Sequence, residues 1–267
     1  MTVVRSFSFG GGVQSTAALV LQAQNKLPKS YDTFLFSNVG NDSEHPETIE
    51  YFNKIHKPYA EKHNINLIEL KRIKRDGSSP SLLEHVTNSK RAIDIPVHLT
   101  GAGPGNRNCT INYKVRVIHK WQKQNGATAD NPGVCGLGIS IDEIQRARTN
   151  SGFDDQVLEY PLIDLKLNRN DCMNIIKDAG LPPAPRSACW FCPFHKKEEW
   201  RSLKREHRDL FDKAVKLEQL LGDRREELGR DRVYLTSRNK PLDQVVDDQL
   251  VLDFGGAETC DTGHCFI

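Results

Sequence analysis

Three consecutive glycines, Gly10, Gly11 and Gly12, restrict the fold of this chain more than any other feature of its sequence. The apolar run 3–9 before them predicts a strand, and the run 15–24 after them predicts a helix. Glycine adopts positive φ values and lets backbone N–H groups approach a ligand closely. The free N–H groups of a helix's first turn attract anions. The segment therefore predicts a strand, a phosphate-binding loop and a helix.

The residues after the glycines exclude two common types of phosphate-binding loop. Gln14 precedes Ser15 and Thr16, whose hydroxyls we expect to donate to phosphate oxygens. The loop lacks both the Gly-Lys-Ser/Thr ending of a Walker loop and the spacing of G-x-G-x-x-G. A smaller group of nucleotide binders remains, and the alternative is an ordinary glycine-rich turn between a strand and a helix.

The order of the predicted elements favours an α/β fold. Further strands are expected at 33–37, 66–70 and 134–138, and helices at 46–63 and 110–124. This alternation predicts a Rossmann-like parallel sheet flanked by helices, and ligands of such sheets bind beyond the carboxyl ends of the strands. The pattern also predicts that the sheet ends near residue 139.

Two regions depart from this alternation. Residues 75–108 lose the periodicity and contain prolines and glycines, so we expect a long loop that contacts substrate. After a short helix at 170–179, the charged stretch 196–227 has apolar residues three or four apart and predicts one or two amphipathic helices. We therefore expect a nucleotide-binding domain at 1–185 and a helical, cysteine-rich C-terminal extension at 186–267.

The hydropathy and charge of the sequence indicate where the protein is located and which partners it binds. None of the apolar runs in the 267 residues approaches the roughly 18 residues that span a bilayer, which predicts a cytoplasmic protein without membrane contact. The balance of 37 basic and 35 acidic residues does not indicate a nucleic-acid binder. The basic cluster around Lys114 leaves nucleic acid open as a partner, and the oligomeric state stays open as well.

Seven cysteines in such a chain favour metal or redox chemistry over a disulfide framework. Cys135 and Cys172 lie among apolar residues and are expected to be small buried side chains. Cys189 and Cys192 have the two-residue spacing of a ligand pair for a metal or an iron–sulfur cluster. The tail adds a second candidate pair, which consists of Cys260 and Cys265.

A single cysteine, Cys109, lies among basic residues that favour its thiolate form. It is a candidate ligand or nucleophile, and the alternative is an inert thiol at the start of a helix. His195 and His264 are weaker ligand candidates, for which an ordinary polar role is favoured.

Taken together, these segments resemble the phosphoadenosine phosphosulfate (PAPS) reductase family of the PP-loop ATP pyrophosphatase superfamily, over most of residues 3 to 195. The glycine loop is similar to the family's Ser-Gly-Gly-x-Asp-Ser, with Gly10 in place of the first serine and Gln14 in place of the aspartate. Segments 37–48 and 138–146 are similar to two further family motifs. The resemblance implies a fold of the adenine nucleotide alpha hydrolase type.

The resemblance also implies an ATP site with Mg²⁺. Its cofactor-binding residues would be Ser8, Gly10, Gly11, Gly12, Gln14, Ser15, Thr16, Ser37, Asn38, Gly138 and Glu143. Adenine would lie against the backbone of 36–38, and Asp142 or Glu143 would lie near the magnesium. Lys114 or Arg146 would stabilise charge on the departing pyrophosphate.

In cluster-bearing members of the family a Cys-Cys pair occurs where this chain has Cys109 and Thr110. The resemblance therefore implies a 4Fe–4S cluster on Cys109, Cys189 and Cys192. Its fourth ligand would be Cys260 or Cys265, or one iron would stay open to sulfide.

Three functions follow from these expectations. The leading hypothesis is an enzyme that adenylates a nucleic acid or nucleotide with ATP and then transfers sulfur to it from sulfide or a donor protein. The first alternative is a reductase of adenylyl sulfate or its 3′-phosphate that uses a tail cysteine. The second is a nucleotide-binding module with structural zinc on Cys189, Cys192, Cys260 and Cys265.

Overall fold

The computed structural model describes residues 3–101 and 103–246, and the chain divides into two compact units. The first unit contains residues 3–79 and 110–188, and the second contains residues 80–109, apart from residue 102, and residues 189–246. The described residues include no helix that is long and apolar enough to cross a membrane.

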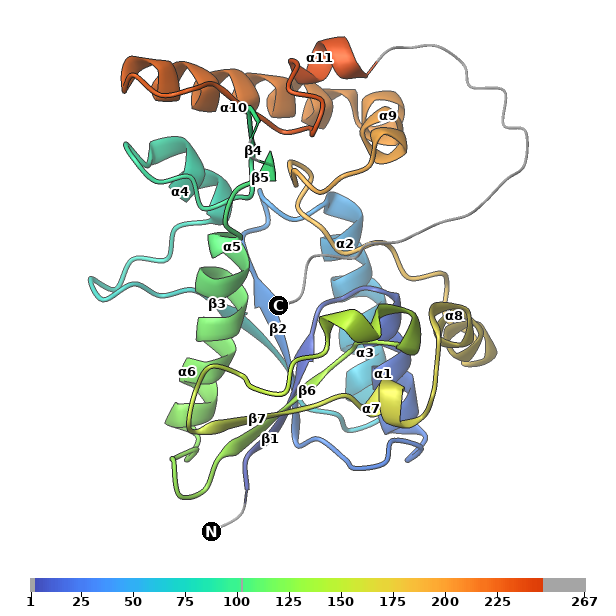
Figure 1. Cartoon of the computed structure of the whole chain (residues 1–267). Helices are drawn as coiled ribbons and strands as arrows, with labels where there is room; N and C mark the ends of the chain where they lie inside the picture. The colour runs from blue at the N-terminus through green and yellow to red at the C-terminus, as the bar shows by residue number, and fades with distance from the viewer. Residues whose placement is uncertain (1–2, 102, 247–267) are drawn as a thin grey trace. The chain divides into compact units, whose positions relative to one another are not determined.

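The first unit is built on a parallel sheet of five strands (Figure 1). In spatial order the strands are β3 (Leu67–Lys71), β2 (Thr33–Asn38), β1 (Arg5–Phe9), β6 (Gly133–Leu137) and β7 (Gln156–Glu159). The sheet confirms the predicted α/β class and the four predicted strands. The expected end of the sheet near residue 139 is wrong, because the short strand β7 pairs with β6 at the edge.

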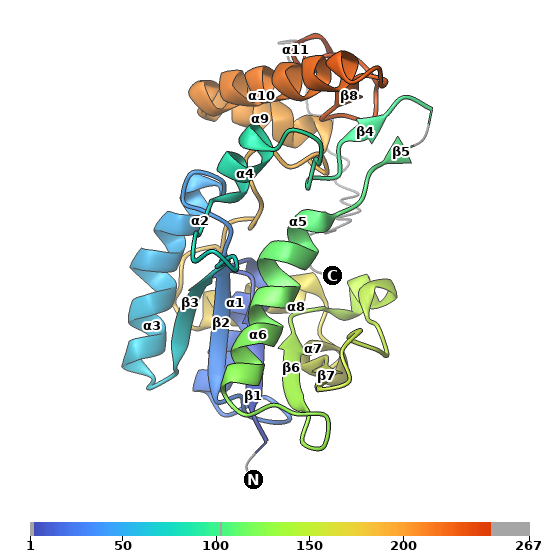
Figure 2. The same cartoon turned by 90° about the vertical axis from the view of Figure 1, so that its left-hand side faces the viewer.

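Helices cover both faces of this sheet. One face packs against α1 (Val13–Ala23), α7 (Pro161–Asp164), α8 (Arg169–Asp178) and a continuous helical run of α2 (Pro46–Tyr51), η1 (Phe52–His56) and α3 (Lys57–Lys62). The other face packs against α6 (Arg116–Gln124), which lies in front of the strands in Figure 2 and continues from α5 (Asn108–Thr110) and η2 (Ile111–Val115). The predicted helices of the first unit are therefore all present.

The apolar side chains of β1 and β2 explain why helices pack against both faces of the sheet. Phe7, Phe9, Phe34 and Phe36 pack with Phe52 of η1 and with the apolar residues of α1 in one core. Leu35 and Cys135 pack with α6 on the opposite face. Cys135 and Cys172 are buried as expected, and burial raises the pKa of each thiol to about 12, so neither supplies a thiolate at neutral pH.

An ion pair joins α6 to the loop before β7. The Asp155 carboxylate accepts a hydrogen bond from Nε2 of His119 at 2.5 Å and lies 3.5 Å from Nζ of Lys123. The bond from His119 holds the pKa of Asp155 below its usual value. A carboxyl group with a depressed folded-state pKa stabilises the fold above its unfolded pKa of about 4, and this contribution is lost as the pH falls through the folded pKa.

We therefore expect Asp155→Asn to flatten the acid limb of the stability profile. Urea unfolding between about pH 3 and pH 7 should show a smaller loss of unfolding free energy in this variant than in the wild type. Asp130→Asn removes a carboxylate from an exposed position and is the control. The expectation is contradicted if both variants change the profile equally.

The second unit combines two distant segments of the chain. Its helices are α4 (Leu82–Asn88), α9 (Lys197–Glu206), α10 (Arg208–Glu227) and α11 (Leu242–Val245). Its three short antiparallel strands have the order β5 (Gly103–Pro104), β4 (His98–Leu99) and β8 (Val233–Tyr234). The stretch 196–227 forms the two amphipathic helices α9 and α10, as predicted.

The division into units differs from the predicted boundary at 185/186 in one respect. Residues 80–109 belong to the second unit, because β4 pairs with β8 and the Arg224 guanidinium of α10 donates to the carbonyls of Val86 and Thr87. The segment 75–108 is also not a plain loop, since it contains α4, β4 and β5.

Candidate functional site

The glycine loop lies at the carboxyl end of β1, where the order of the sheet reverses. β2 lies on one side of β1 and β6 on the other, and the crevice at such a point is where open parallel sheets bind ligands. The backbone after β6 comes close to the loop, because a Cβ atom at Gly138 would lie only 3.3 Å from the backbone nitrogen of Ser15. The two candidate segments 10–16 and 138–143 therefore meet at this crevice.

One of the three loop glycines adopts a positive φ value. Gly11 has φ +78°, and a Cβ atom there would lie 3.4 Å from the ring of Phe36. Gly12 is the N-cap of α1 and offers no side chain to cap it, and the first turn of the helix contains no acidic residue. The first N–H groups of a helix have no carbonyl partner within it, so this end of α1 is suited to an anion.

Gly11→Ala tests whether this geometry serves a ligand. The left-handed conformation costs a residue with a Cβ atom about 1–2 kcal/mol, so a modest loss of stability is expected together with a loss of ATP affinity. Gly77→Ala is a matched control, since Gly77 has φ +82° and open space around it. Unfolding curves and calorimetric titration with ATP should show similar destabilisation in both variants and weakened binding in Gly11→Ala alone. Equal affinities would contradict the loop assignment.

The two hydroxyls after the loop differ in their surroundings. Among the described residues, Oγ of Ser15 donates only to the carbonyl of Gly12, at 2.9 Å. Oγ1 of Thr16 lies 2.8 Å from that same carbonyl and 2.8 Å from Nε2 of His56, and its side chain is fully buried. Thr16 therefore fastens the loop to the core.

His56 is a neutral part of this core. Its ring lies edge-on to Phe9 and Tyr51, with a centroid separation of 4.7 Å in each case. Burial lowers its pKa to about 3. A neutral imidazole beneath the loop leaves the binding of anionic charge to the backbone N–H groups of α1 and to cations elsewhere.

One wall of the crevice is a network around Glu143. Nη1 of Arg146 donates to Oε2 of Glu143 at 2.6 Å, and both side chains are buried. Nε2 of Gln14 lies 3.5 Å from the same carboxylate oxygen and 3.4 Å from Oγ of Ser140. The structure thus brings Gln14, Glu143 and Arg146 together, with the charge of Arg146 directed at Glu143.

A narrow hollow lies beside Lys114. Ser8, Gly10, Phe36, Ser37 and Lys114 line it at the carboxyl ends of β1 and β2. Nζ of Lys114 lies 3.9 Å from a carboxylate oxygen of the buried Glu44. This arrangement places a cation and the ends of two strands around one hollow.

The side chains of Ser37 and Asn38 support the walls of this hollow. Oγ of Ser37 donates to the carbonyl of Tyr113 at 2.5 Å, and the amide of Asn38 donates to Glu69 at 2.8 Å. Oδ1 of Asn38 accepts from the backbone of Gly40, which opens the loop after β2. The side chains of Ser37 and Asn38 are therefore both occupied within the protein.

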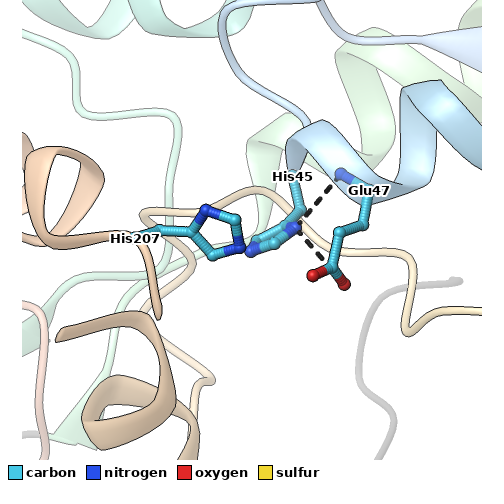
Figure 3. Close-up of side chains that lie close together, drawn as sticks. All are labelled: His45, Glu47 and His207. Atoms are coloured by element: carbon cyan, nitrogen blue, oxygen red, sulfur yellow. Dashed lines mark hydrogen bonds and ion pairs between the residues drawn. The ribbon is translucent and has the colours of Figure 1, made fainter. Parts of the chain in front are cut away.

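The sequence pattern did not predict two residues of the site, Ser187 and His45. Ser187 lies beside the glycine loop, since a Cβ atom at Gly12 would be 3.7 Å from its Cβ, and its buried Oγ has no hydrogen-bond partner among the described residues. His45 begins α2, where its Nδ1 accepts from the backbone of Glu47 at 3.4 Å (Figure 3). The backbone of His45 also donates to the carbonyl of Ala188, which holds segment 186–188 near the loop.

The described cysteine ligand candidates all belong to the second unit. Cys189 and Cys192 lie in one turn, in which the N–H of Cys192 donates to the carbonyl of Cys189 at 3.1 Å, and both are partly exposed. The N–H of Cys109 donates to the carbonyl of Asp94 at 2.7 Å. Within the part of this unit that the structure describes, no three candidate ligand atoms lie within 4.8 Å of one another. Cys260, Cys265 and His264 lie outside the described residues.

Comparison with known proteins concerns the fold. No family model and no curated protein match the chain. Among solved structures, the chain is similar to the crystal structure of phosphoadenylyl-sulfate (PAPS) reductase from Candida auris, determined as a phosphate complex. The two share 12% sequence identity with a TM-score of 0.45, over 68% of this chain and 76% of that chain. At these values the likeness is one of fold alone.

Proposed function

We propose that this protein is a PP-loop enzyme that binds ATP with Mg²⁺ at the glycine loop and transfers the adenylyl group to an oxygen atom of an acceptor. The observation that carries the proposal is the uncapped N-terminus of α1 behind three glycines, at the point where the sheet order reverses. Lys114 in the adjoining hollow adds the cation that a polyphosphate requires.

In this proposal, different residues of the crevice bind the terminal phosphates, the adenosine and the region of the α-phosphorus. The N–H groups of residues 12–15 and the Ser15 hydroxyl bind the terminal phosphates. The backbone ends of β1 and β2 at the hollow contact the adenosine. Lys114 neutralises charge near the α-phosphorus, and Asp142, exposed beside Glu143, is the carboxylate that remains for Mg²⁺ because Glu143 binds Arg146.

In the proposed step the acceptor oxygen forms a bond to the α-phosphorus, and the bond from that phosphorus to the bridging oxygen breaks. Pyrophosphate carries away the electron pair, and the acceptor loses its proton to solvent. Fixed donors that face the departing pyrophosphate lower the barrier because they need no reorganisation when charge develops.

We further propose that sulfur replaces the adenylated oxygen, with AMP as the leaving group and a nucleotide or nucleic acid as the acceptor. Cys109, Cys189 and Cys192 lie in one unit and are the described residues that would hold a 4Fe–4S cluster, together with Cys260 or Cys265. A cluster with one open iron would supply bound sulfide for this replacement.

The test compares nucleotide products. Purified protein is incubated with ATP, adenylyl sulfate or its 3′-phosphate, together with a nucleic-acid acceptor and a dithiol reductant, and pyrophosphate and sulfite are measured. Pyrophosphate from ATP is expected, and Ser15→Ala should lower its release about tenfold, whereas Ser30→Ala, an exposed serine near β2, should not. Sulfite without pyrophosphate would replace the proposal with sulfonucleotide reduction.

A second measurement addresses the sulfur step separately. Protein purified without oxygen is analysed for iron, acid-labile sulfide and zinc, and its visible spectrum is recorded. Iron with sulfide is expected. Zinc without iron would contradict cluster-based sulfur transfer and leave the adenylation proposal standing.

A further inference from the structure

Three donors converge on the carbonyl of Gly12, the residue that caps α1. The backbone N–H of Thr16 donates to it at 2.9 Å, Oγ of Ser15 at 2.9 Å and Oγ1 of Thr16 at 2.8 Å. A carbonyl oxygen has two lone pairs, so its capacity to accept is fully used. Two further glycines precede Gly12 and place no side chain against this peptide. The hydrogen bonds to the carbonyl therefore fix the orientation of the peptide.

The Thr16 hydroxyl is itself held from behind by His56. Nε2 of His56 lies 2.8 Å from Oγ1 of Thr16, and both side chains are fully buried in the first unit. His56 is the last residue of η1, a π-helical turn that the N–H of Lys57 closes by donating to the carbonyl of Phe52. Such turns are rare, and they occur often at functional sites.

The partners of these groups assign the position of each proton. The Gly12 oxygen can only accept, so the Thr16 hydroxyl uses its one proton there and presents a lone pair to His56. Nε2 of His56 must therefore carry the ring proton. Nδ1 has no hydrogen-bond partner among the described residues, so the other tautomer would bury an N–H group without an acceptor. Burial also lowers the pKa of the ring to about 3, which makes His56 a neutral donor.

This chain of hydrogen bonds orients one N–H group of the phosphate site. The carbonyl and the N–H of a trans peptide point in opposite directions. Because the Gly12 carbonyl points along α1 toward Thr16, the N–H of Val13 points out of the first turn, where it has no partner within the helix. If the Ser15 hydroxyl turns to a phosphate, Thr16 and His56 still hold the carbonyl.

We infer that His56 is a positioning residue for the phosphates of a nucleotide. Through Thr16 it holds the peptide between Gly12 and Val13 with its N–H directed at them. The inference rests on the proposed ATP site at the glycine loop. His56 is fully buried and does not contact the ligand, so its loss should weaken the binding of phosphates and leave the contacts to adenosine unchanged.

The first test reads the tautomer of His56 in the wild-type, full-length protein and needs no ligand. Long-range ¹H–¹⁵N spectra of histidine rings distinguish a proton on Nε2 from a proton on Nδ1. A neutral ring with its proton on Nε2 is expected at pH 7. A proton on Nδ1 overturns the inference, because the Thr16 hydroxyl would then donate to His56 and no longer to the Gly12 carbonyl.

The second test separates phosphate binding from adenosine binding. Calorimetric titrations use pyrophosphate, ATP and adenosine, each with Mg²⁺. His56→Phe keeps a ring beside Phe9 and Tyr51 and removes the donor, so it should weaken binding of pyrophosphate and ATP about tenfold and leave adenosine binding unchanged. Ile176→Val trims the same core away from these hydrogen bonds and is the control for lost stability. It should bind all three as the wild type does.

Variants of Thr16 keep the inference falsifiable if His56→Phe folds poorly. Thr16→Ser retains the hydroxyl and should bind pyrophosphate as the wild type does, whereas Thr16→Val keeps the shape and should weaken binding about tenfold. The double variant with Thr16→Val and His56→Phe should lose no more affinity than Thr16→Val alone, because both residues act on one carbonyl. Losses that add overturn the inference, as does equal binding by Thr16→Val and Thr16→Ser.

The wild type distinguishes this failure from that of the proposed function. If it binds neither ATP nor pyrophosphate, the proposed ATP site is wrong and the inference fails with it. If it binds both, and His56→Phe binds them equally tightly, only the inference about His56 is overturned.

Discussion

Replacement of Lys114 by methionine is expected to reduce pyrophosphate release from ATP by about a hundredfold, because loss of a single preorganised donor where charge develops lowers a rate by about 10²–10³. The side chain is only 14% exposed and lines the hollow between the ends of β1 and β2. Methionine keeps the length of the stem and removes the charge, so the walls of the hollow should persist. Initial rates at saturating ATP are the measurement.

Lys120→Met provides the control for Lys114→Met. Lys120 lies on α6, in the same helical run, and is exposed, so this variant loses the same charge from the chain without altering the hollow. Its rate should match that of the wild type. If both variants lose activity equally, the effect comes from the basic surface as a whole, and the assignment of Lys114 to the nucleotide is wrong.

Glu218→Ala is expected to destabilise the second unit by about 3 kcal/mol, which is the penalty for two buried N–H groups that lose their acceptor. Its carboxylate accepts from the backbone of Leu235 at 2.6 Å and of Leu242 at 2.7 Å, and both of these residues are fully buried. One side chain of α10 thus holds the loop after β8 and the start of α11. Burial raises the pKa of this carboxyl group.

Thermal and urea unfolding measure this loss, with Glu227→Ala as the control. Glu227 is exposed at the end of α10, so its removal should change the free energy of unfolding by less than about 0.5 kcal/mol. Similar unfolding midpoints for Glu218→Ala and the wild type would show that water satisfies the two N–H groups, and the anchoring role of Glu218 would be contradicted.

The sheet and the glycine loop could be predicted from the sequence because their signals are local. The apolar runs before and after Gly10 to Gly12 are continuous, and φ +78° at Gly11 is a property that glycine readily supplies. The helix 46–62 was also predictable, although it contains Pro58 and a π-helical middle, because its apolar spacing continues through the proline.

The remaining features depend on contacts between distant residues. β7 has only four residues and follows a polar loop, so nothing in its own sequence distinguishes it from a turn. The partner of Thr16 is His56, forty positions away, and no pattern near Thr16 indicates that its hydroxyl faces the core. The same reason applies to residues 80–109. They belong to the second unit because β4 pairs with β8, which lies far along the chain.

The discontinuous second unit has a consequence for synthesis of the protein. A ribosome that has completed α8 has produced every strand of the five-stranded sheet, but β8 and α10 are still unmade. Until they emerge, β4 lacks its partner, and the carbonyls of Val86 and Thr87 lack the arginine that binds them. A shortened protein that ends after segment 186–188 would keep this unpaired segment permanently. The first unit is therefore better isolated by replacing residues 80–109 with a short linker than by truncation alone.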